Sequence, residues 1–263
     1  MRGIPLTYWL FWAAMCLPLD AYAASYSDAG YLPDCADSVE IAHAHVARVE
    51  QNGALILPDG RAVLLEGIRL PQQGDGPRFL ADQALAALRD MALAGPVTFT
   101  ATAPKEDRYD RIRVQGFGRQ WFQVALLEQG LARVAIAPDR NECAPDLYEA
   151  EARARARHAG IWALAAYQTR KPEAMKGTSG TFQVVDGWVT NVSGGGGRVF
   201  IDFGSNGQRS FSAIIAPEDR RAFRDFDLDG LTAHHIRIRG TVQDYRGRPE
   251  IALSNPSQIE VLN

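Results

Sequence analysis

Residues 106–133 decide the fold, and they read E-D-R-Y-D-R-I-R-V-Q-G-F-G-R-Q-W-F-Q-V-A-L-L-E-Q-G-L-A-R. The stretch opens with a turn that carries an arginine, and residues 111–117 follow as a predicted strand. An amphipathic helix is predicted over 122–129, and it ends at Gly130 because glycine is the common residue just past a helix. The next residues, Leu-Ala-Arg-Val, predict an exit strand.

The segments around this stretch complete one domain over residues 41–166. Alternating apolar and polar side chains predict a strand over 41–49, and turns at Asn52-Gly53 and Asp59-Gly60 separate it from two more. The other predicted elements are strands over 54–57, 62–65 and 97–101, a helix over 79–93, and a last helix capped by Asp146. The order is strands, helix, strands, helix, strand, helix.

Two short motifs give this domain a family resemblance. Residues 107–111 read D-R-Y-D-R, which is the pattern D-x-Y-x-R, and the last helix closes on Gly160-Ile161-Trp162. In these motifs the chain resembles the staphylococcal nuclease (thermonuclease) family. The resemblance implies a mainly β fold with helices, in which an OB-type five-stranded barrel carries three helices.

A second, smaller domain is predicted over residues 181–263. Residues 167–180 are rich in Lys, Pro, Thr, Ser and Gly and predict a linker. Five short strands follow, with a flexible hairpin at the glycine run 194–197 and a short helix over 218–226. This pattern resembles the OB-like β domain found beside bacterial thermonuclease domains. Its aromatic residues, which could include a base-stacking face, are Trp188, Phe200, Phe203, Phe211 and Tyr245.

The first residues predict a signal for export. One early positive charge, an apolar run and the A-x-A pattern of residues 21–23 predict a signal peptide over 1–23, cut before Ala24. The apolar run is short for a membrane span, which needs about 20 residues. The alternatives are an uncleaved anchor and, less favoured, a lipoprotein processed at Cys16. We expect a periplasmic or secreted protein with an extended tail over 24–40 and no membrane span after signal removal.

Two cysteines remain after the predicted signal, Cys35 and Cys143. In an oxidising compartment an even pair favours a disulfide. Two unrelated buried thiols are the alternative. Two sulfurs without histidines at ligand spacing are too few for a metal site, and His43 and His45 are too few on their own.

The resemblance also implies a catalytic site, which this sequence keeps only in part. Thermonucleases hydrolyse phosphodiesters with one calcium ion on two aspartates, a glutamate near the general base and two arginines on the phosphate. The arginine of D-x-Y-x-R is Arg111, which the resemblance places in that site, and Tyr109 would stand near the phosphate or pack on the barrel.

The family string R-L-x-G-I-x-x-P-E corresponds to residues 64–72, L-L-E-G-I-R-L-P-Q. The arginine position holds Leu64, the calcium aspartate position holds Arg69, and the glutamate position holds Gln72. The first aspartate falls at or near Asn52. The calcium ligands are therefore not retained, and no cofactor or metal site is predicted. A rewired metal site from Glu66, Asp75 and Asp59 is an alternative, although strand alternation points Glu66 away from the pocket.

These replacements favour binding over cutting. Arg69 and Arg111 could form a metal-free site for an anion, with Tyr109 beside it. A net charge of −3 argues against a generally basic, DNA-coating protein. We therefore expect an exported protein that binds nucleic acid or another anionic ligand without cutting it. The alternatives are an active phosphodiesterase with a rearranged site, and an envelope scaffold that binds protein.

Overall fold

The computed structural model describes residues 35, 39–72, 74–102, 106–138, 141, 143–203 and 211–262. The predicted signal peptide and most of the predicted tail lie outside these residues. Residues Leu32–Asn263 group as one compact unit. Among the described residues, no helix combines the length and apolar character that a membrane crossing requires.

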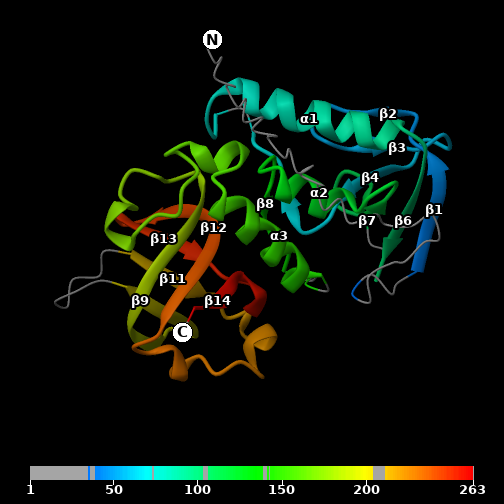
Figure 1. The fold of residues 1–263 in the computed structure, drawn as a ribbon. Helices are drawn as coiled ribbons and strands as arrows, with labels where there is room; N and C mark the ends of the chain where they lie inside the picture. The colour runs from blue at the N-terminus through cyan, green and yellow to red at the C-terminus, as the bar shows by residue number, and fades with distance from the viewer. Residues whose placement is uncertain are drawn as a thin grey trace, which may run out of the picture. The chain divides into compact units, whose positions relative to one another are not determined.

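The first sheet has six strands and curls round on itself. In chain order the strands are β1 Val39–His45, β2 Arg48–Val49, β3 Leu55–Ile56, β4 Ala62–Leu65, β6 Pro96–Ala101 and β7 Arg111–Phe117. They lie side by side in the order β1-β6-β7-β4-β3-β2, and only the β4–β7 pair is parallel. Residues 46–47 alone separate β1 from β2, so the sheet begins and ends on one short stretch of chain (Figure 1).

Three α-helices accompany this sheet: α1 Arg78–Leu93, α2 Phe122–Glu128 and α3 Ala144–Ala156. Each buries an apolar stripe, such as Leu80, Leu85 and Leu88 of α1. The prediction that Asp146 caps α3 is wrong. The cap residue is Cys143, and Asp146 lies inside the first turn, where its negative charge faces the positive end of the helix dipole.

Gly130 ends α2 as predicted and also sets the position of the Gly160-Ile161-Trp162 motif. Its φ is +66°, and a Cβ added there would lie 2.1 Å from the carbonyl oxygen of Ala159. Only glycine fits this approach. The carbonyl of Gly130 accepts a hydrogen bond of 2.9 Å from the N–H of Ile161. Ile161 belongs to the 3-10 helix η2 Gly160–Ala163, in which Ile161 and Trp162 are buried.

The second sheet also has six strands, five of which close a ring. The strands are β9 Phe182–Gly195, β10 Arg198–Phe203, β11 Phe211–Ile215, β12 His235–Tyr245, β13 Arg248–Ala252 and β14 Ile259–Val261. Their order is β13-β11-β10-β9-β12-β14, and an additional pairing of β12 with β13 completes the ring. The predicted hairpin turns at Gly196 and Gly197 as expected. The helix predicted over 218–226 is wrong in extent, because only η4 Arg220–Phe223 is helical there, as a 3-10 turn.

The two sheets share one connectivity. Numbered from its own first strand, with β1 and β2 taken together, each sheet runs 1-2-3-5-4 and then returns to strand 1. In each, the third and fifth strands are the parallel pair, β4 with β7 and β11 with β13.

A small apolar cluster connects the helices of the first sheet to the second. It joins Leu80, Ile161 and Trp162 to Phe182 and Val184 of β9. Tyr167 of the predicted linker belongs to the same cluster, and Met175, next to η3 Pro172–Ala174, is buried in the second core. The remaining short helices are η5 Asp229–Leu231 and η6 Pro256–Gln258.

The predicted disulfide is confirmed. Cys35 and Cys143 are bonded across a separation of 108 residues. The bond ties the chain before β1 to Cys143, the residue that caps the start of α3. Such a long loop corresponds to about 4–5 kcal/mol of stabilisation in the chain-entropy treatment.

Candidate functional site

A cavity of about 510 Å³ lies where the first sheet, a short strand pair and the second sheet meet. The short pair is β5 Ile68–Arg69 with β8 Arg133–Val134. We call this the arginine cavity, because Arg69, Arg111 and Arg113 line it. The remaining lining residues are Asn52, Gly53, Leu64, Leu65, Glu66, Gly67, Ile68, Leu70, Gln72, Leu88, Ala135, Ala137, Pro138, Phe182 and Thr241.

Arg111 begins β7 and is held by the turn before it. Asp107 accepts hydrogen bonds from Nε and Nη2 of Arg111 at 2.9 and 2.6 Å. Asp107 also accepts from the backbone N–H groups of Tyr109 and Arg111, which forms the turn. Burial acts to raise the pKa of Asp107, but the hydrogen bonds from Arg111 and the backbone outweigh it and leave the pKa below its ordinary value.

Tyr109 is 59% exposed and lies outside the cavity lining. Its ring faces the guanidinium groups of Arg108 and Arg111, whose central carbons lie 4.8 and 4.9 Å from the ring centre. Tyr109 therefore contacts Arg111 from the solvent side.

Arg69 lies on β5 opposite Arg133 of β8. Asp75 sits between them: its Oδ2 atom is 3.4 Å from Nη2 of Arg69 and 3.3 Å from Nη2 of Arg133. The same oxygen accepts from the backbone N–H of Gln72 at 3.1 Å. Asp75, which the sequence offered as an alternative metal ligand, is thus paired with two arginines.

Arg133 is 3% exposed, and burial lowers its pKa to about 10 even though Asp75 opposes the shift. Its Nη1 atom donates to the carbonyl of Phe182 at 2.7 Å. This arginine could not be singled out from the sequence, because an arginine in a short strand carries no motif.

Arg113 was also missed, although a signal for it was present. In R-I-R-V the side chains of Arg111 and Arg113 share one face of β7 by strand alternation. Arg113 pairs in register with Leu64 of β4, the position at which the family resemblance implies an arginine. Its Nη1 atom is 3.5 Å from Oε2 of Glu66.

The expectation that Glu66 points away from the pocket is wrong. Glu66 lines the arginine cavity while its side chain is only 8% exposed. The backbone N–H of Glu66 donates to the carbonyl of Val114 at 2.9 Å, so the pairing with β7 continues past Leu65. Glu66 lies two residues after Leu64, and strand alternation therefore places both residues on the face that lines the cavity.

The three other positions singled out by the family string and the first hairpin, Leu64, Gln72 and Asn52, all line the cavity. Gln72 donates from its side-chain amide to the carbonyl of Leu70 at 3.1 Å. Asn52 accepts from the N–H of Ala54 at 2.9 Å and so closes its own turn.

Calcium, which the family resemblance implies, does not fit this donor set. A hard cation takes several carboxylate and carbonyl oxygens, but the carboxylates of Glu66, Asp75 and Asp107 each face an arginine. Within the described residues, no three His, Cys, Asp or Glu side chains gather as a metal would require.

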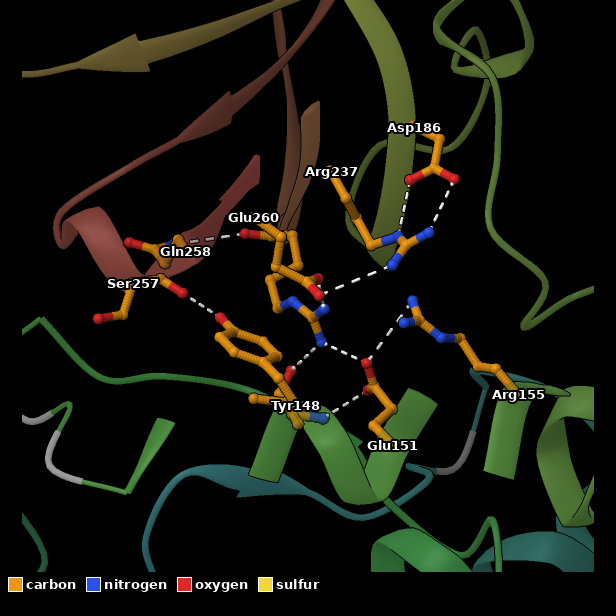
Figure 2. A network of polar contacts seen from close by, with 10 residues as sticks. Tyr148, Glu151, Arg155, Asp186, Arg237, Ser257, Gln258 and Glu260 are labelled. Carbon is orange, nitrogen blue, oxygen red and sulfur yellow. Dashed lines mark hydrogen bonds and ion pairs between the residues drawn. The ribbon is translucent and has the colours of Figure 1, made fainter. Parts of the chain in front are cut away.

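A buried polar network joins the second sheet to α3 (Figure 2). Nη1 of Arg239, on β12, lies 2.7 Å from Oε2 of Glu151, on α3, and both side chains are at most 1% exposed. Nη2 of Arg239 pairs with Glu260, and its guanidinium lies 4.4 Å from the ring centre of Tyr148. Burial acts to lower the pKa of Arg239, but Glu151, Tyr148 and Glu260 outweigh it and leave the pKa raised.

The outer part of this network lies on the second sheet. Nε of Arg237 lies 2.7 Å from Asp186 across the β12–β9 pair, and its Nη1 atom lies 3.6 Å from Glu260. Tyr148 donates its hydroxyl to the carbonyl of Ser257, and burial raises the pKa of Tyr148 to about 12.

Glu151 connects this network to the arginine cavity. Its Oε1 atom accepts from the backbone N–H of Val134 at 2.8 Å. Val134 belongs to β8 and pairs with Ile68, the residue next to Arg69 on β5. The strand pair that carries Arg69 is therefore held by Glu151 of α3 and, through Arg239, by β12.

The aromatic residues of the second sheet divide between core and surface. Phe203 and Phe211 are buried in its core, whereas Trp188 and Tyr245 are 56% and 41% exposed. Trp188 stacks on His235 with ring centres 5.3 Å apart. Phe203 and Phe211 are therefore core residues, and of the aromatics named from the sequence Trp188 and Tyr245 are the exposed ones.

Comparison with curated proteins found no match for this chain. The family model described as "Staphylococcal nuclease homologue" matches residues 62–164. The matched span runs from β4 to the residue after η2, and it contains Leu64, Arg69, Gln72 and Arg111. It stops before β9, and the second sheet has no family assigned to it. Residues 62–164 are therefore a domain of the staphylococcal nuclease homologue family.

Proposed function

We propose that this protein binds nucleic acid or another anionic ligand in the arginine cavity and does not cut it. The observation that carries the proposal is the lining of the cavity itself. Among the described residues that line it, Arg69, Arg111 and Arg113 are arginines and Glu66 is a carboxylate. Guanidinium groups bind phosphate oxygens through paired hydrogen bonds, which makes arginine the preferred residue for such a site.

The salt bridges of these arginines leave donors for a ligand. Asp107 engages Nε and Nη2 of Arg111, but a guanidinium carries five N–H donors in all. The same group can therefore hold a carboxylate and a phosphate oxygen together. Asp107 also fixes the orientation of Arg111, which lowers the entropy that binding must overcome.

Hydrolysis lacks its usual groups in this arrangement. Gln72 stands where the family has a glutamate, and an amide does not accept a proton near neutral pH. Arg69 stands at a metal-ligand position, and its positive charge repels a divalent cation. Removal of one such group from an enzyme commonly lowers the rate by a factor of hundreds.

The same proposal extends to architecture and location. We assign both sheets to the OB type, which the shared strand order 1-2-3-5-4 supports. The domains would then cover residues 41–166 and 181–263, with 167–180 as linker. The Cys35–Cys143 disulfide supports an oxidising location, periplasmic or secreted, after removal of the predicted signal.

The test is a binding and cleavage assay on the mature protein with fluorescein-labelled single-stranded DNA. We expect binding at low salt, no cutting with calcium or with EDTA, and weaker binding for Arg111→Ala and Arg113→Gln. Each lost phosphate contact should reduce the slope of log affinity against log salt by about 0.7. Arg48→Gln is the matched control, because Arg48 is 65% exposed and outside the cavity lining.

Two results overturn the proposal, and each favours one alternative. Calcium-dependent cutting that EDTA stops and Arg111→Ala abolishes would establish a phosphodiesterase with a rearranged site. Absence of DNA binding at low salt, with intact folding, would favour an envelope scaffold that binds protein.

A further inference from the structure

Two residues of the second sheet line the arginine cavity, although the family domain ends before that sheet begins. They are Phe182, the first residue of β9, and Thr241 of β12. The two are register partners across the β9–β12 ladder. The second sheet therefore presents one cross-strand pair to the cavity.

Phe182 is fixed in this position by the arginines beside it. Its carbonyl accepts from Arg133 at 2.7 Å. Its ring centre lies 4.8 Å from the guanidinium carbon of Arg133 and 5.7 Å from that of Arg69. Phe182 also belongs to the apolar cluster with Ile161 and Trp162. The aromatic wall and the cationic wall of the cavity are thus in direct contact.

Thr241 is fixed by its neighbours on β12. Gly240 and Val242 on either side are buried, whereas Thr241 is exposed. Arg239, two residues earlier and on the same strand face, is anchored to Glu151 of α3. Figure 2 shows the network around this anchor, with Glu151 on α3 and Glu260 on the second sheet. Thr241 is held against the cavity without being part of the buried network.

We infer that the second sheet forms one wall of the ligand site, with Thr241 as a specificity-determining position. This inference rests on the proposed anion binding. Phosphate groups bind at Arg69, Arg111 and Arg113, and the part of the ligand next to the phosphate lies against Phe182 and Thr241. The site therefore selects an organic anion that extends past its charged group.

A charge-swap series at position 241 tests this wall. Because Thr241 is exposed, Thr241→Lys and Thr241→Glu leave the core intact. With single-stranded DNA of about ten nucleotides at roughly 0.1 M salt, Thr241→Lys should tighten binding several-fold and Thr241→Glu should weaken it by about tenfold. A gain of affinity cannot result from misfolding.

The matched controls are Gln243→Lys and Gln243→Glu. Gln243 is exposed, faces the same side of β12 and lies outside the cavity lining. Two residues along a strand are about 7 Å, and the Debye length at this salt is about 10 Å. The added distance and screening should limit the shift in affinity of the controls to less than about threefold.

The outcomes separate this inference from the proposed function. Equal effects at positions 241 and 243, together with loss of binding in Arg111→Ala, would overturn the second-sheet wall and leave anion binding in place. DNA binding that is absent, or unchanged by Arg111→Ala and Arg113→Gln, would overturn both. Opposite and large shifts at position 241 alone support the wall.

Discussion

Arg239 and Glu151 form a buried ion pair, with Nη1 and Oε2 at 2.7 Å and side chains 1% and 0% exposed. The pair joins β12 of the second sheet to α3 of the family domain. Desolvation of two charges is expensive, so such a pair is not a source of stability in itself. Each charge offsets the desolvation cost of the other, so removal of one partner leaves the other buried without compensation.

Loss of one partner should therefore be severe. Arg239→Met leaves Glu151 buried with only the 3.9 Å contact to Arg155 as a cation partner in the network. We expect the free energy of unfolding to fall by about 3–5 kcal/mol. Urea denaturation followed by tryptophan fluorescence measures this change.

The double variant Arg239→Met with Glu151→Leu should recover a large part of that loss, since no unpaired charge remains. Arg153→Met is the surface control: Arg153 pairs with Glu128 at 2.7 Å, but both side chains are 41% exposed. Its expected cost is under about 1 kcal/mol. Similar losses for Arg153→Met and Arg239→Met would contradict this account.

Asp107→Asn should tighten anion binding. The substitution removes a negative charge 2.6 Å from Nη2 of Arg111 while it keeps the shape of the turn. Fluorescence anisotropy with labelled single-stranded DNA measures the gain, which we expect to be several-fold. Weaker binding in this variant would show that orientation of Arg111 outweighs its free charge.

The free energy of unfolding should also depend on pH through the Asp107 carboxyl group. The pKa of Asp107 lies below its ordinary value of 3.8 in the folded protein. A depressed pKa contributes stability that is present above the unfolded value and is lost as pH falls through the folded one. Denaturation curves between pH 5 and about 2 should therefore show a steeper loss for the wild type than for Asp107→Asn.

Gly130→Ala should disrupt the contact between α2 and η2. The added Cβ would stand 2.1 Å from the oxygen of Ala159, at a φ of +66° that alanine rarely adopts. We expect a loss of more than about 2 kcal/mol. Gly60→Ala separates the two causes, because its φ is +89° with nothing within 4 Å; it should cost about 1 kcal/mol. Equal losses would show that the close approach does not matter.

Reduction of the disulfide should lower the melting temperature. The Cys35–Cys143 bond spans 108 residues, and the chain-entropy treatment assigns it about 4–5 kcal/mol. Thermal denaturation with and without dithiothreitol measures the shift, and Cys35→Ser with Cys143→Ser should reproduce it without further response to reductant. An unchanged melting temperature would mean that the reduced chain is already constrained.

Local periodicity predicted most strands and helices, because alternation and helical spacing are properties of neighbouring residues. It failed at particular residues. At the start of the last helix, α3 begins two residues before Asp146, at Ala144. Glu66 was assigned to the wrong strand face, although it lies two residues after Leu64 and lines the same cavity. The motif D-x-Y-x-R located Arg111, and strand alternation alone places Arg113 on the same face of β7.

The contacts that complete the cavity could not be predicted in this way. Arg239 and Glu151 are 88 residues apart, and Arg133 reaches Phe182 across 49. Neither pair has a local spacing, since both depend on how the second sheet meets α3 and β8. A single sequence carries no periodic pattern that predicts such long-range tertiary contacts.

The position of Glu151 also sets an order of events during synthesis. Its helix leaves the ribosome well before Arg239, 88 residues later, and before Glu260, 21 residues later still. Until Arg239 is in place, Glu151 lacks its main cation partner, and burial of that face of α3 would leave an unpaired charge in the interior. The contact between α3 and the second sheet therefore cannot be complete until Arg239 and Glu260 are both available.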